Sequence, residues 1–154
     1  MEALLNPVAP NVEIVYGERP PNFDKIRKVF PLSIAPGVVF SYGDKIFVNS
    51  KNELPPEILA HERVHCERQL AMGVEAWWDQ YLVDPQFRYK EELLAHQVEY
   101  TFLRGLYPGQ ARKKSILKHV AGKLSSRLYG PMVSLEQAKK ALKQCGKIYN
   151  THLK

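Results

Sequence analysis

Short runs typical of β-strands occur in the first third of the chain, and apolar residues follow the helical period after it. Residues 11–16 alternate as a short strand would, and residues 23–30 fit either a short helix or a second strand. The runs 38–42 and 45–49 are rich in β-branched and aromatic residues and flank Gly43-Asp44. A Gly-Asp pair between two such runs predicts a hairpin with a two-residue loop.

Apolar stripes with helical spacing fill the remainder of the chain. Pro55-Pro56 suits the first turn of a helix, where the missing N–H is not needed, and Gly73 ends that helix. Ser134 and Gln137 form a capping box for the last helix. The stripes between these signals predict helices over residues 55–72, 85–104, 110–128 and 134 to about 144, with a short aromatic segment over 75–82.

The elements indicate an α+β fold in a single domain, residues 1–154, with 1–10 irregular, 11–50 β-rich and 54–145 helical. An apolar content of 45% and a charged content of 25% are ordinary for a globular domain of 154 residues. Trp77, Trp78 and Tyr81 make a compact aromatic face, which we interpret as core packing rather than as a substrate pocket. We find no repeat and no second domain.

The sequence His61-Glu62-Arg63-Val64-His65 lies inside the first predicted helix. Residues four apart lie on one face of a helix, so both imidazoles can bind one Zn²⁺. Glu62 lies about 100° round the helix axis, beside the metal, where it can act as a general base without binding the ion. An alternative is that both histidines are merely buried residues of an ordinary helix.

Hydrolytic zinc needs a third protein ligand and an open position. His96, His119, Glu91 and Glu92 are the candidates downstream. Only one of the two adjacent glutamates can face the metal, and we favour Glu92 because it shares a helical stripe with Ala95, His96 and Glu99. His96 either contacts one of the metal ligands and fixes its orientation, without binding the metal itself, or is a plain helix-surface histidine.

These motifs, followed by Trp78, Tyr81, Arg88, Glu92-Leu93-Leu94-Ala95 and residues 124–130, resemble the small neutral zinc metallopeptidases of tailed bacteriophages and prophages. Those enzymes are zincins, and the resemblance covers residues 54–142. It implies a small antiparallel N-terminal sheet packed on the helix that carries the two histidines, with an edge strand that pairs with an extended substrate; a purely structural hairpin is the alternative. This chain departs from the pattern at His96, where a small or aromatic residue is common.

By this resemblance, which is of the gluzincin kind, His61, His65 and Glu92 bind one Zn²⁺ and Glu62 is general base and acid for hydrolysis of a peptide or protein substrate. Possible oxyanion donors are Tyr100, Tyr129, His96 and Arg88, of which we favour Tyr129 because it precedes the flexible Gly130. Two alternatives are a zinc amidase that acts on cell wall and a catalytically silent zincin-fold protein that binds nucleic acid or a protein partner.

The formal net charge is +6, and the basic residues cluster late in the chain. No recognised nucleic-acid module surrounds them, so we interpret them as a solvated face, with nucleic-acid binding as the alternative. The sequence has no long apolar run or export signal, and its two cysteines, Cys66 (interpreted as a core thiol) and Cys145, make no disulfide framework. We therefore expect a cytoplasmic protein without a membrane partner, in the host cytoplasm if phage-encoded. The sequence defines no oligomeric state.

Overall fold

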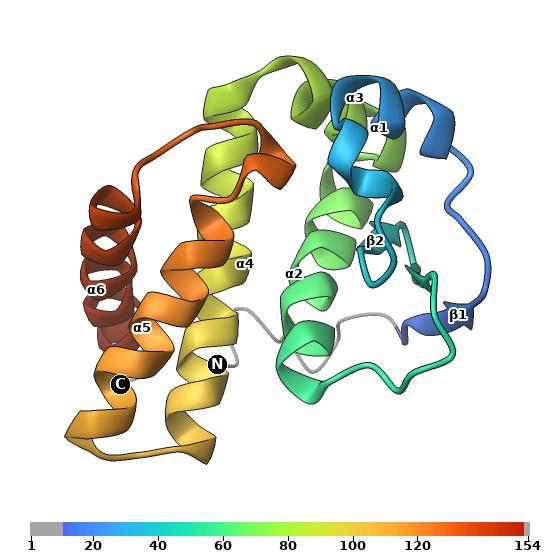
Figure 1. Ribbon diagram of the computed structural model, residues 1–154. Helices are drawn as coiled ribbons and strands as arrows, with labels where there is room; N and C mark the ends of the chain where they lie inside the picture. The colour runs from blue at the N-terminus through green and yellow to red at the C-terminus, as the bar shows by residue number, and fades with distance from the viewer. Residues whose placement is uncertain (1–10, 153–154) are drawn as a thin grey trace.

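The computed structural model describes the backbone of residues 11–152 and the side chains of residues 11–144 (Figure 1). The expected irregular segment 1–10 and the side chain of Cys145 lie outside these ranges. The described chain has an α+β fold, with a small sheet beside a larger helical part. Its elements are β1 (Glu13–Tyr16), α1 (Phe23–Val29), η1 (Pro31–Ile34), β2 (Val39–Tyr42), β3 (Lys45–Val48), α2 (Pro56–Met72), α3 (Val74–Val83), α4 (Pro85–Leu106), α5 (Gln110–Leu124), η2 (Arg127–Tyr129) and α6 (Leu135–His152).

The sheet has three strands in the order β1-β3-β2. Strands β2 and β3 pair antiparallel with Tyr42 opposite Lys45, so the predicted hairpin with Gly43-Asp44 as its loop is confirmed. Strand β1 pairs parallel with β3, so the expectation of a purely antiparallel sheet is wrong. The chain crosses from one edge of the sheet to the other through α1 and η1 before the hairpin returns β3 to the centre. The sequence allowed either a short helix or a second strand over residues 23–30, and the structure has a helix there, α1.

Helix α2 packs against the sheet through a buried amide. The side chain of Gln69 is fully buried; its Nε2 donates to the carbonyl and hydroxyl oxygens of Ser41 (3.2 and 3.0 Å), and its Oε1 accepts from the backbone N–H of Gly43 (2.7 Å). The Trp78 indole donates to the same Ser41 carbonyl (3.2 Å). The hairpin is thus fixed to α2 and α3 by hydrogen bonds as well as by apolar packing.

Helices α2 and α4 run side by side through the centre of the molecule (Figure 1). Their contact is made by small or β-branched residues, Ala60 and Val64 on α2 and Ala95 and Val98 on α4. Short side chains let two helix axes approach closely. This close contact brings the polar residues next to it, on both helices, within reach of one another.

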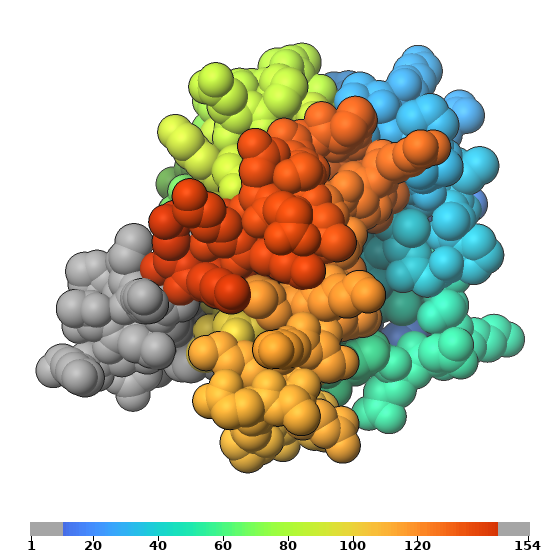
Figure 2. All heavy atoms as spheres, turned by 60° about the vertical axis from the view of Figure 1, so that its left-hand side comes forward, coloured from blue at the N-terminus to red at the C-terminus, as the bar shows by residue number. Residues whose placement is uncertain are grey.

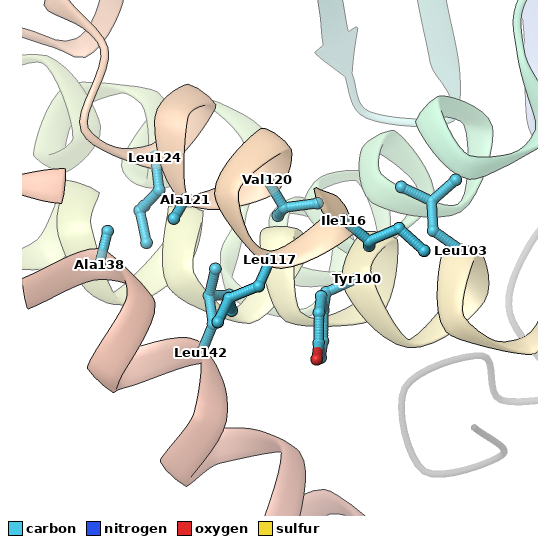
Figure 3. Close-up of a cluster of buried hydrophobic side chains, with 9 residues drawn as sticks. All are labelled: Tyr100, Leu103, Ile116, Leu117, Val120, Ala121, Leu124, Ala138 and Leu142. Carbon is cyan, nitrogen blue, oxygen red and sulfur yellow. The ribbon is translucent and has the colours of Figure 1, made fainter. Parts of the chain in front are cut away.

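The C-terminal helices form a separate part of the core. Residues of α4, α5 and α6 make the buried cluster drawn in Figure 3: Tyr100, Leu103, Ile116, Leu117, Val120, Ala121, Leu124, Ala138 and Leu142. The predicted capping box of α6 is confirmed, because Ser134 and Gln137 each accept a hydrogen bond from the other's backbone N–H (3.1 and 2.9 Å). No helix among the described residues is long and apolar enough to span a membrane.

Helix α5 ends at Leu124, earlier than the predicted residue 128. Two serines change the direction of the chain: Ser125 Oγ donates back to the Ala121 carbonyl (2.9 Å), and Ser126, in an extended conformation, accepts from the Leu128 N–H (3.0 Å). The apolar stripe continues through Leu128 and so concealed this break. The η2 turn that follows packs Tyr129 against the core cluster that includes Trp77, Trp78 and Tyr81.

Candidate metal centre

Helices α2 and α4 bring together the three residues that we predicted as metal ligands. His61 and His65 project from successive turns of α2 toward Glu92 on α4. The His61 Nε2 atom lies 3.5 Å from Glu92 Oε2, and the His65 Nε2 atom lies 3.3 Å from Glu92 Oε1. All three side chains are buried.

The separation of these atoms fits a zinc ion. Bonds of about 2.1 Å in a tetrahedral site place ligand atoms about 3.4 Å apart, close to the two distances above. Moreover, His65 Nε2 and Glu92 Oε2 are buried and make no hydrogen bond among the described residues. Buried polar atoms without partners are costly, so their convergence indicates a ligand. Two imidazole nitrogens and one carboxylate are also a donor set typical of catalytic zinc.

The neighbouring Glu91 has other partners. Its carboxylate accepts hydrogen bonds from the Trp77 indole (2.8 Å) and from the Arg68 guanidinium (2.9 and 3.1 Å). Because Glu91 is on a different face of α4 from Glu92, it belongs to no group of potential metal-binding side chains within the described residues. The geometry therefore favours Glu92, as the helical stripe did.

Electrostatics prepare Glu92 to bind a cation. Burial by itself would raise the pKa of this carboxyl, but His65 and His61 outweigh it and hold the pKa well below the usual range. Tyr81 on α3 donates a hydrogen bond from its hydroxyl to Glu92 Oε1 (2.5 Å). Burial, and then Glu92, raise the pKa of Tyr81, so this hydroxyl keeps its proton and stays a donor. Glu92 is thus ionised and held in one orientation.

A second carboxylate, Glu99 on α4, lies behind His61. Its Oε1 is 3.0 Å from His61 Nδ1, and its Oε2 accepts a hydrogen bond from the Lys123 ammonium (2.6 Å). Burial opposes ionisation of Glu99, but the contact with His61 prevails and lowers its pKa to about 2. A carboxylate on the far nitrogen of a metal-ligating histidine fixes the ring and raises its basicity.

His96 lies in the same layer, behind the ligands. Its ring makes an edge-on contact with His61, with centroids 4.5 Å apart, and its Nδ1 is 2.7 Å from the Glu92 backbone carbonyl oxygen. Burial, and then His61, lower its pKa to about 4, so the ring is neutral. His96 is fully buried, so it is not a helix-surface histidine. It also forms a second group of potential metal-binding side chains with His61 and Glu99.

A cavity of about 480 Å³ opens beside these ligands. Glu62 lines it together with His61, His65 and Glu92, and its carboxylate Oε1 lies 3.9 Å from His61 Nε2. Burial raises the pKa of Glu62, against the opposing effect of the two histidines. The rest of the lining is mainly apolar and comes from every layer around the site: Ile26, Phe30, Val38, Val39, Phe40, Val48, Leu54, Ile58, Trp77, Trp78, Tyr81, Leu128 and Tyr129.

The candidate oxyanion donors occupy different places. Tyr129 lines the cavity, whereas Tyr100 is part of the core between α4, α5 and α6. The guanidinium of Arg88 donates to the carbonyls of Tyr81 (2.8 Å), Leu82 (3.2 Å) and Tyr129 (3.1 Å). Arg88 is therefore occupied with holding α3 and η2 together, and Tyr129 is the donor that the geometry favours.

Three partners of the site were not assigned a role from sequence: Tyr81, Glu99 and Lys123. Glu99 was visible as a member of the Glu92 stripe, one heptad further along the helix. Tyr81 was interpreted with Trp77 and Trp78 as core rather than as pocket; all three rings belong to a core cluster but also line the cavity, and the Tyr81 hydroxyl bonds Glu92. Lys123 was interpreted as part of the solvated basic face, because its contact with Glu99 joins residues 24 positions apart on different helices and leaves no local pattern.

Comparison with known proteins gave no match, whether to protein-family models, to curated proteins or to solved structures.

Proposed function

We propose that this chain is a zinc-dependent metallopeptidase with one Zn²⁺ bound by His61, His65 and Glu92, and a zincin-like fold. The observation that carries the proposal is the convergence of these three buried side chains next to Glu62 in one cavity. A purely structural zinc site is closed by a fourth protein ligand. Here the three predicted ligands line an open cavity together with Glu62, whose carboxylate would remain free to act on water if zinc were bound.

The reaction assigns separate tasks to the residues of the site. Zinc, when bound, supplies Lewis acidity that activates water and polarises a carbonyl group. Glu62 takes a proton from the attacking water on a carboxylate oxygen and passes it to the leaving amine. Glu99 and Tyr81 keep His61 and Glu92 in place. The Tyr129 hydroxyl donates a hydrogen bond to the oxyanion as it forms.

The edge strand β2 supports a peptide as substrate. In a hairpin with a two-residue loop, Tyr42 and Phe40 form the hydrogen-bonded pairs with β3, so the backbone groups of Val39 and Ser41 point away from the sheet. The Ser41 carbonyl is occupied by Gln69 and Trp78, whereas Val39 lines the cavity. An extended peptide can pair with such an edge through its backbone. The mainly apolar lining argues against a glycan-bearing substrate and hence against a cell-wall amidase.

Substitution Glu62→Gln tests this function, because an amide cannot act as a general base. The zinc-loaded protein would be incubated with a mixed peptide library and with purified peptidoglycan, and cleavage products would be identified by mass spectrometry. Glu67→Gln, on the same helix but outside the cavity, is the matched control. We expect peptide cleavage by wild type and by Glu67→Gln, and none by Glu62→Gln with zinc still bound. Cleavage retained in Glu62→Gln would refute the mechanism, and release of peptidoglycan fragments alone would refute the substrate class.

A further inference from the structure

Charge is distributed very unevenly along the chain. Residues 100–154 contain twelve Lys and Arg residues and a single acidic residue, Glu136, whereas residues 1–99 contain ten basic and fifteen acidic residues. The net charge of +6 therefore arises entirely from the last third of the sequence. Such asymmetry between parts of a chain is typical of proteins that bind polyanions.

The structure places much of this charge on the surface of two adjacent helices. Helices α5 and α6 pack together through the cluster in Figure 3 and lie next to each other on the face shown in Figure 2. Among the described residues, their exposed cations have no acidic side chain within ion-pair distance, unlike Lys123 and Lys139, which pair with Glu99 and Glu136. The unpaired cations, which we call the basic surface, are Arg112, Lys113, Lys114, Lys118, Lys140 and Lys143.

An exposed aromatic ring lies at one end of the basic surface. Tyr107, in the turn between α4 and α5, is 47% exposed, and the Arg112 guanidinium lies 5.5 Å from its ring centre. Arg104 donates hydrogen bonds to the carbonyls of Tyr107 (3.2 Å) and Gly109 (2.9 Å) and so ties this turn to the end of α4. An exposed ring beside several cations offers a stacking surface for a base next to sites for phosphate.

We infer that the basic surface of α5 and α6 binds nucleic acid through its phosphates, without base-specific contacts, and that Tyr107 gives it a preference for single strands. A specific protein interface would need a buried apolar centre. On α5, however, the residues between the cations are Ser115, His119 and Gly122, and the apolar stripe is already buried in the core. The inference is independent of the proposed peptidase, because the catalytic cavity lies between α2, α4 and the sheet.

Charge reversal tests this inference with a matched control. Fluorescence anisotropy would measure binding of the full chain to labelled DNA of about 30 nucleotides, single-stranded and duplex, at several salt concentrations. The test variant is Lys113→Glu/Lys114→Glu/Lys118→Glu. The control is Lys25→Glu/Lys28→Glu/Lys51→Glu, which changes the net charge equally at exposed lysines of the N-terminal half. Circular dichroism would verify that both variants fold.

We expect the test variant to lose at least about tenfold in affinity for DNA, and the slope of log affinity against log salt concentration to fall in magnitude by about two. The affinity of the control variant should change by less than about threefold. Tyr107→Ala should weaken single-strand binding more than duplex binding. Absence of DNA binding by wild type, or equal losses in the two triple variants, would overturn the inference.

A third arm uses vesicles that contain phosphatidylserine, because Leu106 is also exposed at this corner. Binding to vesicles but not to DNA would assign the basic surface to a membrane instead.

Discussion

Glu99 contacts His61 on the side of the ring opposite to Glu92. The distance from Glu99 Oε1 to His61 Nδ1 is 3.0 Å, whereas His61 Nε2 faces Glu92 Oε2 at 3.5 Å. The His61 ring is therefore held between two carboxylates of α4, which lie about two helical turns apart. Lys123 completes the chain of contacts by binding the other oxygen of Glu99 at 2.6 Å.

Glu99→Gln should weaken zinc binding without removing a ligand. The amide is neutral and gives the His61 ring a weaker acceptor, and loss of such an outer partner typically costs about 10–100-fold in metal affinity. Competition with a chelating dye would measure the affinity. Glu136→Gln, which breaks an exposed Glu–Lys pair on α6, is the control and should leave affinity unchanged. Equal affinities in wild type and Glu99→Gln would show that Glu99 has no influence on the metal.

Tyr81→Phe should destabilise the protein and loosen Glu92. The substitution removes a buried hydrogen bond to a charged carboxylate, which contributes about 1.5–3 kcal/mol to the free energy of unfolding. Urea denaturation of the zinc-loaded protein would measure the loss. Tyr100→Phe is a matched control, since this tyrosine is similarly buried but belongs to the core of the C-terminal helices. A loss no greater than that of Tyr100→Phe would contradict a special role for the Tyr81 hydroxyl.

Gln69→Leu should separate the hairpin from α2. Leucine leaves the Gly43 N–H without its acceptor and the Ser41 hydroxyl without its donor, both in a buried place. We expect a loss of about 2–4 kcal/mol in the free energy of unfolding. Gln86→Leu, at an exposed position of α4, should change stability by less than about 0.5 kcal/mol. Similar free energies of unfolding for the two variants in urea would show that the hydrogen bonds of the Gln69 side chain do not stabilise the protein.

Local signals in the sequence were sufficient for most of the fold. The hairpin, the helix starts at Pro56, Pro85 and Leu135, and the helix end at Gly73 all follow from turn and capping residues. The parallel pairing of β1 with β3 was missed because it joins segments about thirty residues apart and leaves no local pattern. The early end of α5 was missed because Leu128 continues the apolar stripe after Ser125 and Ser126 have turned the chain.

For the site, spacing within one helix was informative and contacts between helices were not. One motif predicted that His61, Glu62 and His65 lie at one site, and the stripe on α4 predicted that Glu92 joins them; the structure does bring these four side chains together. The partners that hold these predicted ligands come from three different helices, α3, α4 and α5. Such contacts depend on how the helices pack, which a periodic pattern does not specify.

Zinc content tests the central claim most directly. Purified wild type, Glu92→Gln and Glu91→Gln would be equilibrated with Zn²⁺, dialysed and measured by elemental analysis, with circular dichroism as a check of folding. We predict one zinc per chain in wild type and in Glu91→Gln, whose carboxylate binds Trp77 and Arg68 instead, and a large loss in Glu92→Gln. Wild type without zinc, or zinc lost from Glu91→Gln but kept by Glu92→Gln, would contradict the proposed centre.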